Sequence, residues 1–240
     1  MELAYKTALI TGGTAGIGLA CARLMSREGA SVIITGRDAE RGKAAAASID
    51  GSVRFVEADL ADIESVRSLV EQAGDIDILV NNAASFPAAL TVDQGLESFE
   101  KTFDTNVRGT YFLAAGLAPG MLERGHGSII NVTTMVAKKG VPGAGAYSAS
   151  KAAVESLTRT WAAEFGSRQV RVNSVAPGPT KTEGVEAEWG ETNEELGRAL
   201  PLGRTAKPEE IAEAVLFLAS PRSTFVTGSV LHVDGGGTAV

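Results

Sequence analysis

At 240 residues the chain is long enough to bury a substantial core, as one domain or as two. It is 44% hydrophobic and 21% charged, as ordinary globular proteins are, and its formal net charge of −7 argues against a nucleic-acid partner. The single cysteine, Cys21, excludes an intrachain disulfide, and two isolated histidines, His126 and His232, are too few for a metal site, so we expect no metal.

The sequence has no apolar run approaching the ~20 residues that span a bilayer. Its start, Met1–Lys6, lacks the basic residues and the long apolar core of a signal peptide. We therefore expect a cytoplasmic protein with no membrane partner.

Short apolar runs alternate along the chain with amphipathic stretches. The expected strands are Thr7–Thr11, Ser31–Thr35, Val53–Glu57, Ile76–Asn81, Ser128–Thr133, Val170–Val175 and Val230–Val233. The expected helices are 16–28, 39–48, 62–73, 97–123, 148–166 and 208–219. Continuous apolar runs are typical of parallel strands buried on both faces, and strand–helix alternation produces right-handed crossovers. The pattern predicts an α/β fold: a doubly wound parallel sheet of about seven strands with helices on both faces, as a single domain over 1–240.

The stretch 178–207 interrupts this alternation. It is rich in glycine and proline, which predicts a loop with short helices. A segment of this length is typical of a lid or a binding loop, and a structured surface insertion is the alternative.

A glycine-rich turn, Thr11–Gly18, lies between the first expected strand and the first expected helix. Its spacing is G-x-x-x-G-x-G, not the G-x-G-x-x-G of the general dinucleotide fingerprint. Glycines here let the backbone approach a pyrophosphate, and the helix N-terminus offers free N–H groups and a positive dipole end. The turn therefore predicts a dinucleotide site, with a plain strand-to-helix connection as the alternative.

The residues after the second and third strands bear on which dinucleotide binds. An acidic residue after the second strand would bind ribose hydroxyls and repel a 2′-phosphate, but the chain has Gly36 and then Arg37. A guanidinium matches a phosphate, so we predict NADP, with NAD possible and a solvated loop arginine as the alternative reading. A second basic residue in the glycine turn would support NADP further, but the position before Gly16 is Ala15. Asp59, after the third strand, is expected either to bind the adenine amino group or to cap the next helix.

Tyr147 and Lys151 stand four residues apart in a run that resembles the start of a helix, so their side chains share one face. An ammonium beside a phenol favours the phenolate. The spacing predicts a Tyr147 pKa below its usual value of about 10 and proton exchange near neutral pH. By itself such a pair also fits an ordinary surface contact.

Further motifs follow in order: Asn81-Asn82-Ala83-Ala84, Asn106, Thr134, Pro177-Gly178 and Thr227–Gly236. Together with the glycine turn and the Tyr–Lys pair, they make the chain resemble the short-chain dehydrogenase/reductase family over essentially its whole length, and its 3-oxoacyl-carrier-protein reductase-like and glucose dehydrogenase-like members in particular. The resemblance implies an NAD(P)-dependent oxidoreductase on a Rossmann-like domain that interconverts a carbonyl and a secondary alcohol, as a homotetramer or a homodimer. The cofactor contacts it implies are Gly12, Thr14, Gly16, Ile17, Gly18, Arg37, Asp59, Leu60, Asn82, Ala83, Tyr147, Lys151, Pro177, Gly178 and Thr180.

Two positions depart from the family's pattern. Ala84 replaces a glycine, and its methyl group narrows a place where backbone runs close to the cofactor. Thr134 stands where the family has its catalytic serine. Threonine keeps the hydroxyl, but its methyl restricts χ1 and the space beside the reacting carbon, so we expect activity with an altered substrate shape. Thr133 is expected to point to the opposite face of its strand.

The resemblance also implies a division of roles. In reduction, Tyr147 donates a proton to the carbonyl oxygen, Thr134 hydrogen-bonds that oxygen, and Lys151 lowers the tyrosine pKa and holds the nicotinamide ribose. Asn106 is implied to anchor a water chain to Lys151. Its low helix propensity predicts a local distortion, and a hydrogen bond to neighbouring backbone is the alternative role. Thr180 is expected to place its backbone near the nicotinamide carboxamide.

The substrate itself is left open as a small carbonyl or alcohol compound. By position its pocket is expected to be lined by mostly apolar residues: Phe86, Pro87, Met135, Val136, Val141 and Trp189. This suits a hydrophobic or mixed carbonyl compound. Lys138 and Lys139 are expected to be a solvated pair, with contact to an anionic substrate or carrier as the alternative.

Two other functions compete. A non-catalytic NAD(P)-binding regulator would typically have lost Tyr147 or Lys151, and both are present. A nucleotide-sugar epimerase or dehydratase would need a separate sugar-binding domain, for which 240 residues leave little room. Oligomerisation is implied through the helices that contain Asn106 and Tyr147. The apolar residues there that suit either the core or an interface are Ala152, Ala153, Leu157 and Trp161.

Overall fold

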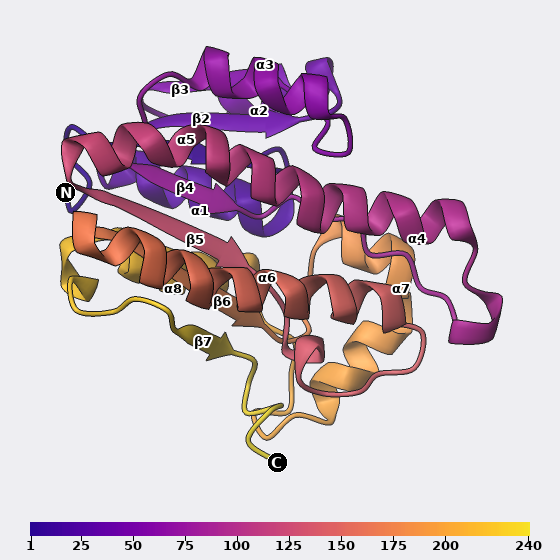
Figure 1. Cartoon of the computed structure of the whole chain (residues 1–240). Coiled ribbons are helices and arrows are strands. Elements are labelled where there is room, and N and C mark those ends of the chain that lie inside the picture. The colour runs from indigo at the N-terminus through magenta and orange to yellow at the C-terminus, as the bar shows by residue number, and fades with distance from the viewer.

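One seven-stranded sheet forms the centre of the molecule in the computed structural model, which describes residues 1–240 (Figure 1). All of its strands run parallel, in the order β3-β2-β1-β4-β5-β6-β7. Their bounds are β1 Thr7–Ile10, β2 Ser31–Gly36, β3 Val53–Glu57, β4 Ile78–Asn81, β5 Gly127–Val132, β6 Val170–Pro177 and β7 Val230–Val233. The predicted doubly wound α/β fold is confirmed.

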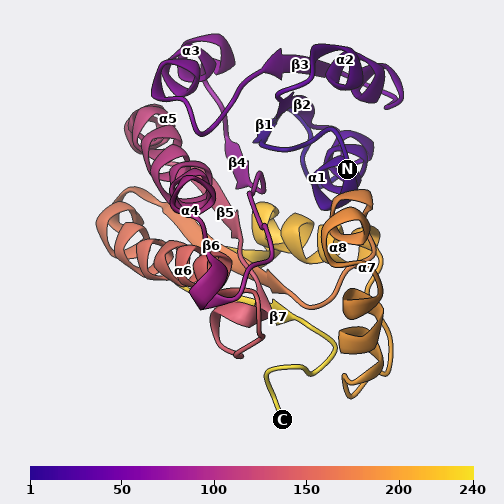
Figure 2. The ribbon, with the colours of Figure 1, turned by 90° about the vertical axis from the view of Figure 1, so that its right-hand side faces the viewer.

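Helices cover both faces of the sheet. Their bounds are α1 Gly16–Arg27, α2 Ala39–Ala47, α3 Ile63–Ala73, α4 Leu96–Phe103, α5 Thr110–Arg124, α6 Gly145–Phe165, α7 Glu183–Arg198 and α8 Pro208–Ala219. Figure 2 shows α3, α4, α5 and α6 on one side of the sheet and α1, α2 and α8 on the other. Successive residues of β4 pack on opposite faces of the sheet. Leu79 belongs to the hydrophobic core formed with α3, α5 and α6, and Val80 to the core formed with α1 and α8. Burial on both faces explains why the strands are continuous apolar runs.

The strand order reverses at the centre of the sheet. β1 lies between β2 and β4, so the chain builds outward first through β2 and β3 and then through β4 to β7. In such sheets, ligands bind outside the carboxyl ends of the strands at this reversal. The glycine turn that follows β1 and the Asn81–Ala84 segment that ends β4 both lie there.

The helix expected over 97–123 is interrupted. A π-helical turn, Asp104–Gly109, separates α4 from α5. A Cβ on Gly109 would overlap the Leu60 carbonyl, so the turn is packed tightly against the segment after β3. The distortion predicted at Asn106 is confirmed, and π turns frequently occur at functional sites.

Residues 178–207 contain one substantial helix, α7, rather than loop alone. Gly190 breaks it with a left-handed backbone (φ 48°, ψ −124°), which leaves two short helical halves. The first half is connected to β6 by a short extended segment and reaches across the carboxyl edge of the sheet. None of the helices combines the length and apolar character needed to cross a membrane.

Candidate active site

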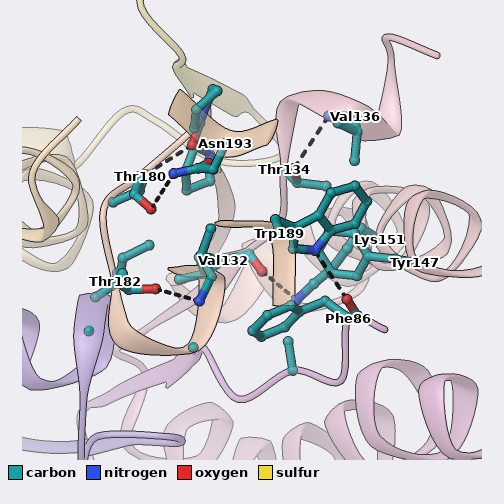
Figure 3. A pocket seen from close by; sticks show the side chains of 18 of the residues that line it. Phe86, Val132, Thr134, Val136, Tyr147, Lys151, Thr180, Thr182, Trp189 and Asn193 are labelled. Carbon is teal, nitrogen blue, oxygen red and sulfur yellow. Dashed lines mark hydrogen bonds between the residues drawn. The ribbon is translucent and has the colours of Figure 1, made fainter. Parts of the chain in front are cut away.

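A cavity of about 310 Å³ opens at the carboxyl ends of the central strands. It lies between the glycine turn, the segment after β4, the start of α6 and helix α7 (Figure 3). Most of the residues predicted from the sequence line it: Gly12, Gly16, Ile17, Asn82, Ala83, Thr134, Tyr147, Lys151, Pro177, Gly178 and Thr180. Thr14 lines an adjoining depression, and Gly18 lies behind the glycine turn. Arg37, Asp59, Leu60 and Asn106 lie outside the cavity lining.

The glycine turn has the geometry of a phosphate cradle. Gly12 and Gly16 take positive φ angles of 63° and 52°, which other residues rarely adopt. Asn82 fixes the turn to β4, because its Nδ2 donates to the carbonyl oxygens of Thr11 at 2.9 Å and of Gly12 at 3.2 Å. No side chain caps the N-terminus of α1, so its first N–H groups are left for a ligand. These residues fit a dinucleotide pyrophosphate.

The predicted ribose and adenine contacts stand apart from the cavity. Arg37 is exposed at the end of β2 and makes no hydrogen bond or ion pair, so its guanidinium is free to meet a phosphate. Asp59 does not cap the following helix: Asp62 does, accepting from Glu64 N at 3.0 Å. The Asp59 carboxylate instead accepts from Ala61 N at 3.0 Å, so the capping alternative is wrong.

The hydroxyl groups of Tyr147 and Thr134 lie side by side on the cavity wall formed by the start of α6 and the residues after β5. Tyr147 lies in the first turn of α6, and Thr134 follows β5 in an extended conformation (φ −168°). Thr134 is only 8% exposed, and its Oγ1 accepts from Val136 N at 3.3 Å, which fixes the hydroxyl beside the phenol (Figure 3). Burial raises the pKa of Tyr147 to about 12, and the neighbouring Thr134 hydroxyl lowers it by less. The tyrosine is therefore a protonated acid near neutral pH.

The prediction that the pKa of Tyr147 lies below its usual value is wrong for this structure. The Lys151 ammonium donates to the Val132 carbonyl at 2.8 Å and lies 5.9 Å from the centroid of the Tyr147 ring (Figure 3). Burial lowers the pKa of Lys151 itself to about 8, so its charge is only partly retained above neutral pH. Desolvation, which depends on packing and not on the i,i+4 spacing, decides both shifts.

Asn106 connects the π turn to α6. Its Nδ2 donates to Ser85 O at 2.8 Å and to Ser150 Oγ at 2.9 Å, and its Oδ1 accepts from Ser85 N at 2.7 Å. Ser150 in turn donates to the Tyr147 carbonyl at 2.7 Å. Both amide hydrogens of Asn106 are engaged, so the contacts shown are structural, and the water chain stays a prediction.

The substrate end of the cavity is apolar. Of the six residues expected there, Phe86, Met135, Val136, Val141 and Trp189 line it and Pro87 does not. The Phe86 and Tyr147 rings meet edge to face with centroids 6.1 Å apart. Neither Lys138 nor Lys139 lines the cavity, and Lys139 Nζ donates to Gly237 O at 3.0 Å.

Helix α7, called the lid from here on, forms one wall of the cavity. Trp189 Nε1 donates to Phe86 O at 3.3 Å, and Glu188 accepts from Ala88 N at 2.8 Å. On the cofactor side, Arg41 of α2 pairs with Glu183 at 2.6 Å. Arg41 was not singled out from the sequence, and its position in the first turn of the helix after Arg37 is the signal that would have found it.

A buried polar chain behind the cavity was also missed. Asn81, Asn131 and Ser174 are paired in register across β4, β5 and β6. Asn81 Nδ2 donates to Asn131 Oδ1 and Asn131 Nδ2 to Thr158 Oγ1, each at 2.8 Å. Thr133 Oγ1 donates to Glu155 Oε1 at 3.1 Å, and Thr133 also lines the cavity beside Thr134. Polar residues that end apolar strands were the available signal.

Comparisons with known proteins agree on one family. A family model described as Enoyl-(Acyl carrier protein) reductase matches residues 12–238. The 3-oxoacyl-(acyl-carrier-protein) reductase FabG of Thermotoga maritima is 38% identical over 98% of this chain and 99% of its own. A solved structure named short chain dehydrogenase/reductase family protein is 63% identical, covers 100% of both chains and superposes with a TM-score of 0.97. Another, a candidate NAD(P)-dependent gluconate 5-dehydrogenase from Beutenbergia cavernae solved with NADP at low occupancy, is 37% identical over 100% of this chain and 99% of its own, with a TM-score of 0.94.

Proposed function

The chain belongs to the short-chain dehydrogenase/reductase family of oxidoreductases, and we propose that it reduces a ketone to a secondary alcohol with NADPH. The observation that carries this proposal is the pair of hydroxyls of Tyr147 and Thr134 on the wall of a cavity whose other end is the phosphate cradle. A bound nicotinamide cofactor would supply the hydride there.

Tyr147 acts as the general acid in this proposal. Its pKa of about 12 keeps the phenol protonated near neutral pH, which is the form that donates a proton as charge develops on the carbonyl oxygen. Oxidation would use the same residue in reverse, as the phenolate base, so the pKa does not select the direction of the reaction. Thr134 Oγ1 would hydrogen-bond the same oxygen and orient the carbonyl.

Lys151 supports the acid electrostatically. Its ammonium lies below the tyrosine ring, and its positive charge would stabilise the phenolate left after proton transfer. Asn106 holds the start of α6 through Ser150, so we assign it a positioning role, with the proton relay as a further proposal.

NADP is the proposed cofactor. The free guanidinium of Arg37 at the end of β2 supports it, as does the NADP bound to the Beutenbergia cavernae relative. The names of the relatives suggest two substrate classes, an acyl group on a carrier protein and a sugar acid. Assembly as a homotetramer or a homodimer and a cytoplasmic location stay proposals.

The decisive experiment replaces Tyr147 with Phe, which removes only the hydroxyl. We expect kcat for NADPH-dependent reduction of a ketone panel to fall by roughly 10²- to 10⁴-fold, as loss of a general acid does. NADPH binding, measured by fluorescence, should be retained and controls for folding. Wild-type turnover in the variant would refute the acid assignment, and wild-type protein that binds NADPH but reduces no carbonyl would favour a non-catalytic regulator.

A further inference from the structure

We propose that the substrate is an uncharged, largely apolar ketone, and that this protein discriminates against carboxylates and against acyl groups on polyanionic carriers. The inference rests on the proposed ketone reduction at Tyr147 and assigns its substrate class. It separates this chain from both substrate classes that the names of its relatives suggest.

The cavity offers no partner for an anion. Lys151 is the only charged side chain among the lining residues. It is 3% exposed, and its ammonium is already directed at the Val132 carbonyl at 2.8 Å. A carboxylate entering the substrate end would lose its water without gaining a cation, and an unpaired buried charge is strongly unfavourable.

Of the polar groups that the lid contributes, the Trp189 N–H is engaged and the Asn193 amide is engaged through one N–H. Trp189 Nε1 donates to the Phe86 carbonyl, which leaves the ring of the indole against the cavity (Figure 3). Asn193 Nδ2 donates to Thr180 O at 3.4 Å. The remaining wall at this end is aliphatic or aromatic, so a ketone with apolar substituents matches it.

The lid also carries a net negative charge. α7 holds six glutamates and one basic residue, Arg198. Glu188 stands at the rim itself, because it accepts from Ala88 N on the facing segment. Three more of the glutamates are exposed and make no ion pair: Glu186, Glu191 and Glu195.

Cations offset part of this charge. Arg41 and Lys181 pair with two of the lid glutamates, and Arg198 lies on α7 itself. Lys138 and Lys139, between β5 and α6, keep their charges, and Lys139 donates to the Gly237 carbonyl. Negative charge at the rim of a cavity slows the approach of negatively charged ligands, over a range of about one Debye length, ~8–10 Å. A carrier with several phosphates would meet this field before its acyl group reached Tyr147.

Matched substrates with the same reacting ketone test the inference. Acetoacetate is compared with ethyl acetoacetate, and acetoacetyl-CoA with the acetoacetyl thioester of N-acetylcysteamine, by NADPH oxidation at low and high salt. We expect kcat/KM for the ethyl ester to exceed that for the carboxylate by roughly 10- to 100-fold. The neutral thioester should exceed the CoA thioester by about two- to fivefold at low salt, and the difference should shrink as salt is added.

The variant Glu188→Gln should narrow the difference between the two thioesters, while the same change at Glu71, exposed on α3 far from the mouth, should leave it unchanged. Equal or higher kcat/KM for the anionic member of either pair overturns the inference and leaves ketone reduction standing. Absence of turnover with all four compounds, in protein that binds NADPH, overturns the proposed function and the inference together.

Discussion

Lys151 shows how a functional residue opposes folding. The group is buried and its pKa falls from 10.5 in the open chain to about 8 in the folded protein. Between these values the unfolded chain binds the additional proton, so the free energy of unfolding rises with pH through this window. Below about pH 8 the buried charge therefore destabilises the fold, as charged active-site groups often do.

The variant Lys151→Met tests this effect by filling the same space without charge. We expect the stability of the wild type relative to the variant to rise by up to roughly 3 kcal/mol between about pH 8 and pH 10.5. Urea unfolding of the cofactor-free proteins across that range measures the difference. Lys101→Met, at an exposed position on α4, is the control and should show no such trend. A difference that does not vary with pH would contradict the prediction.

Thr134 separates the contribution of a hydroxyl from that of a methyl group. Thr134→Ser keeps the hydroxyl and widens the cavity, so we expect turnover to be retained and bulkier ketones to gain relative to small ones. Thr134→Val keeps the shape and removes the hydrogen bond to the substrate oxygen, which should lower kcat by about 10²-fold. Steady-state kinetics of both variants on ketones of increasing size measures the two effects. If Val is as active as Ser, the hydroxyl has no catalytic role.

At the scale of elements, the sequence was informative wherever one local signal dominated. The strands could be predicted because burial on both faces requires continuous apolar runs. The glycine turn could be predicted because a positive φ at Gly12 and Gly16 demands glycine. The π turn between α4 and α5 was predicted only as a distortion, since its place depends on the close packing of Gly109 against Leu60. The predicted lowering of the Tyr147 pKa was wrong, because the residue spacing reveals a neighbouring charge but does not reveal the burial that raises the pKa.

The lid α7 is coupled to the cofactor end through one ion pair. Arg41 lines a depression together with Thr14 and Ala15 of the glycine turn, and Glu183 pairs with it at 2.6 Å. Arg37 follows β2 directly, four residues before Arg41. A 2′-phosphate near Arg37 would compete with Glu183 for Arg41.

Glu183→Gln should therefore tighten NADP binding by about two- to fivefold and leave NAD binding unchanged, because exposed pairs are worth at most ~1 kcal/mol. Arg41→Gln should weaken NADP binding and again spare NAD. Titration calorimetry with both dinucleotides measures the two constants. Equal changes for NAD and NADP would show that Arg41 does not meet the 2′-phosphate.

At the scale of the whole molecule, one side carries apolar residues that the fold does not cover. Leu96 and Phe99 on α4 and Tyr111 and Phe112 on α5 are 71%, 40%, 42% and 51% exposed. Tyr111 also packs against Trp161 of α6 with ring centroids 5.8 Å apart, so this surface continues directly into the core. Apolar patches of this kind mark association surfaces. Because α6 also carries Tyr147, association here would brace the helix that holds the proposed acid.

Phe112→Glu is expected to disrupt this association, since it would bury a charge in the contact. Sedimentation at micromolar concentration should give a wild-type mass that is a multiple of 24.7 kDa and a variant mass reduced to half or less. Tyr5→Glu, which changes a residue exposed at the opposite end of the sheet, is the control and should keep the wild-type mass. Because α6 carries both Trp161 and Tyr147, the variant should also lose turnover more than it loses NADPH affinity. A wild-type protein that sediments as a 24.7 kDa monomer would refute the assembly and leave the exposed aromatics unexplained.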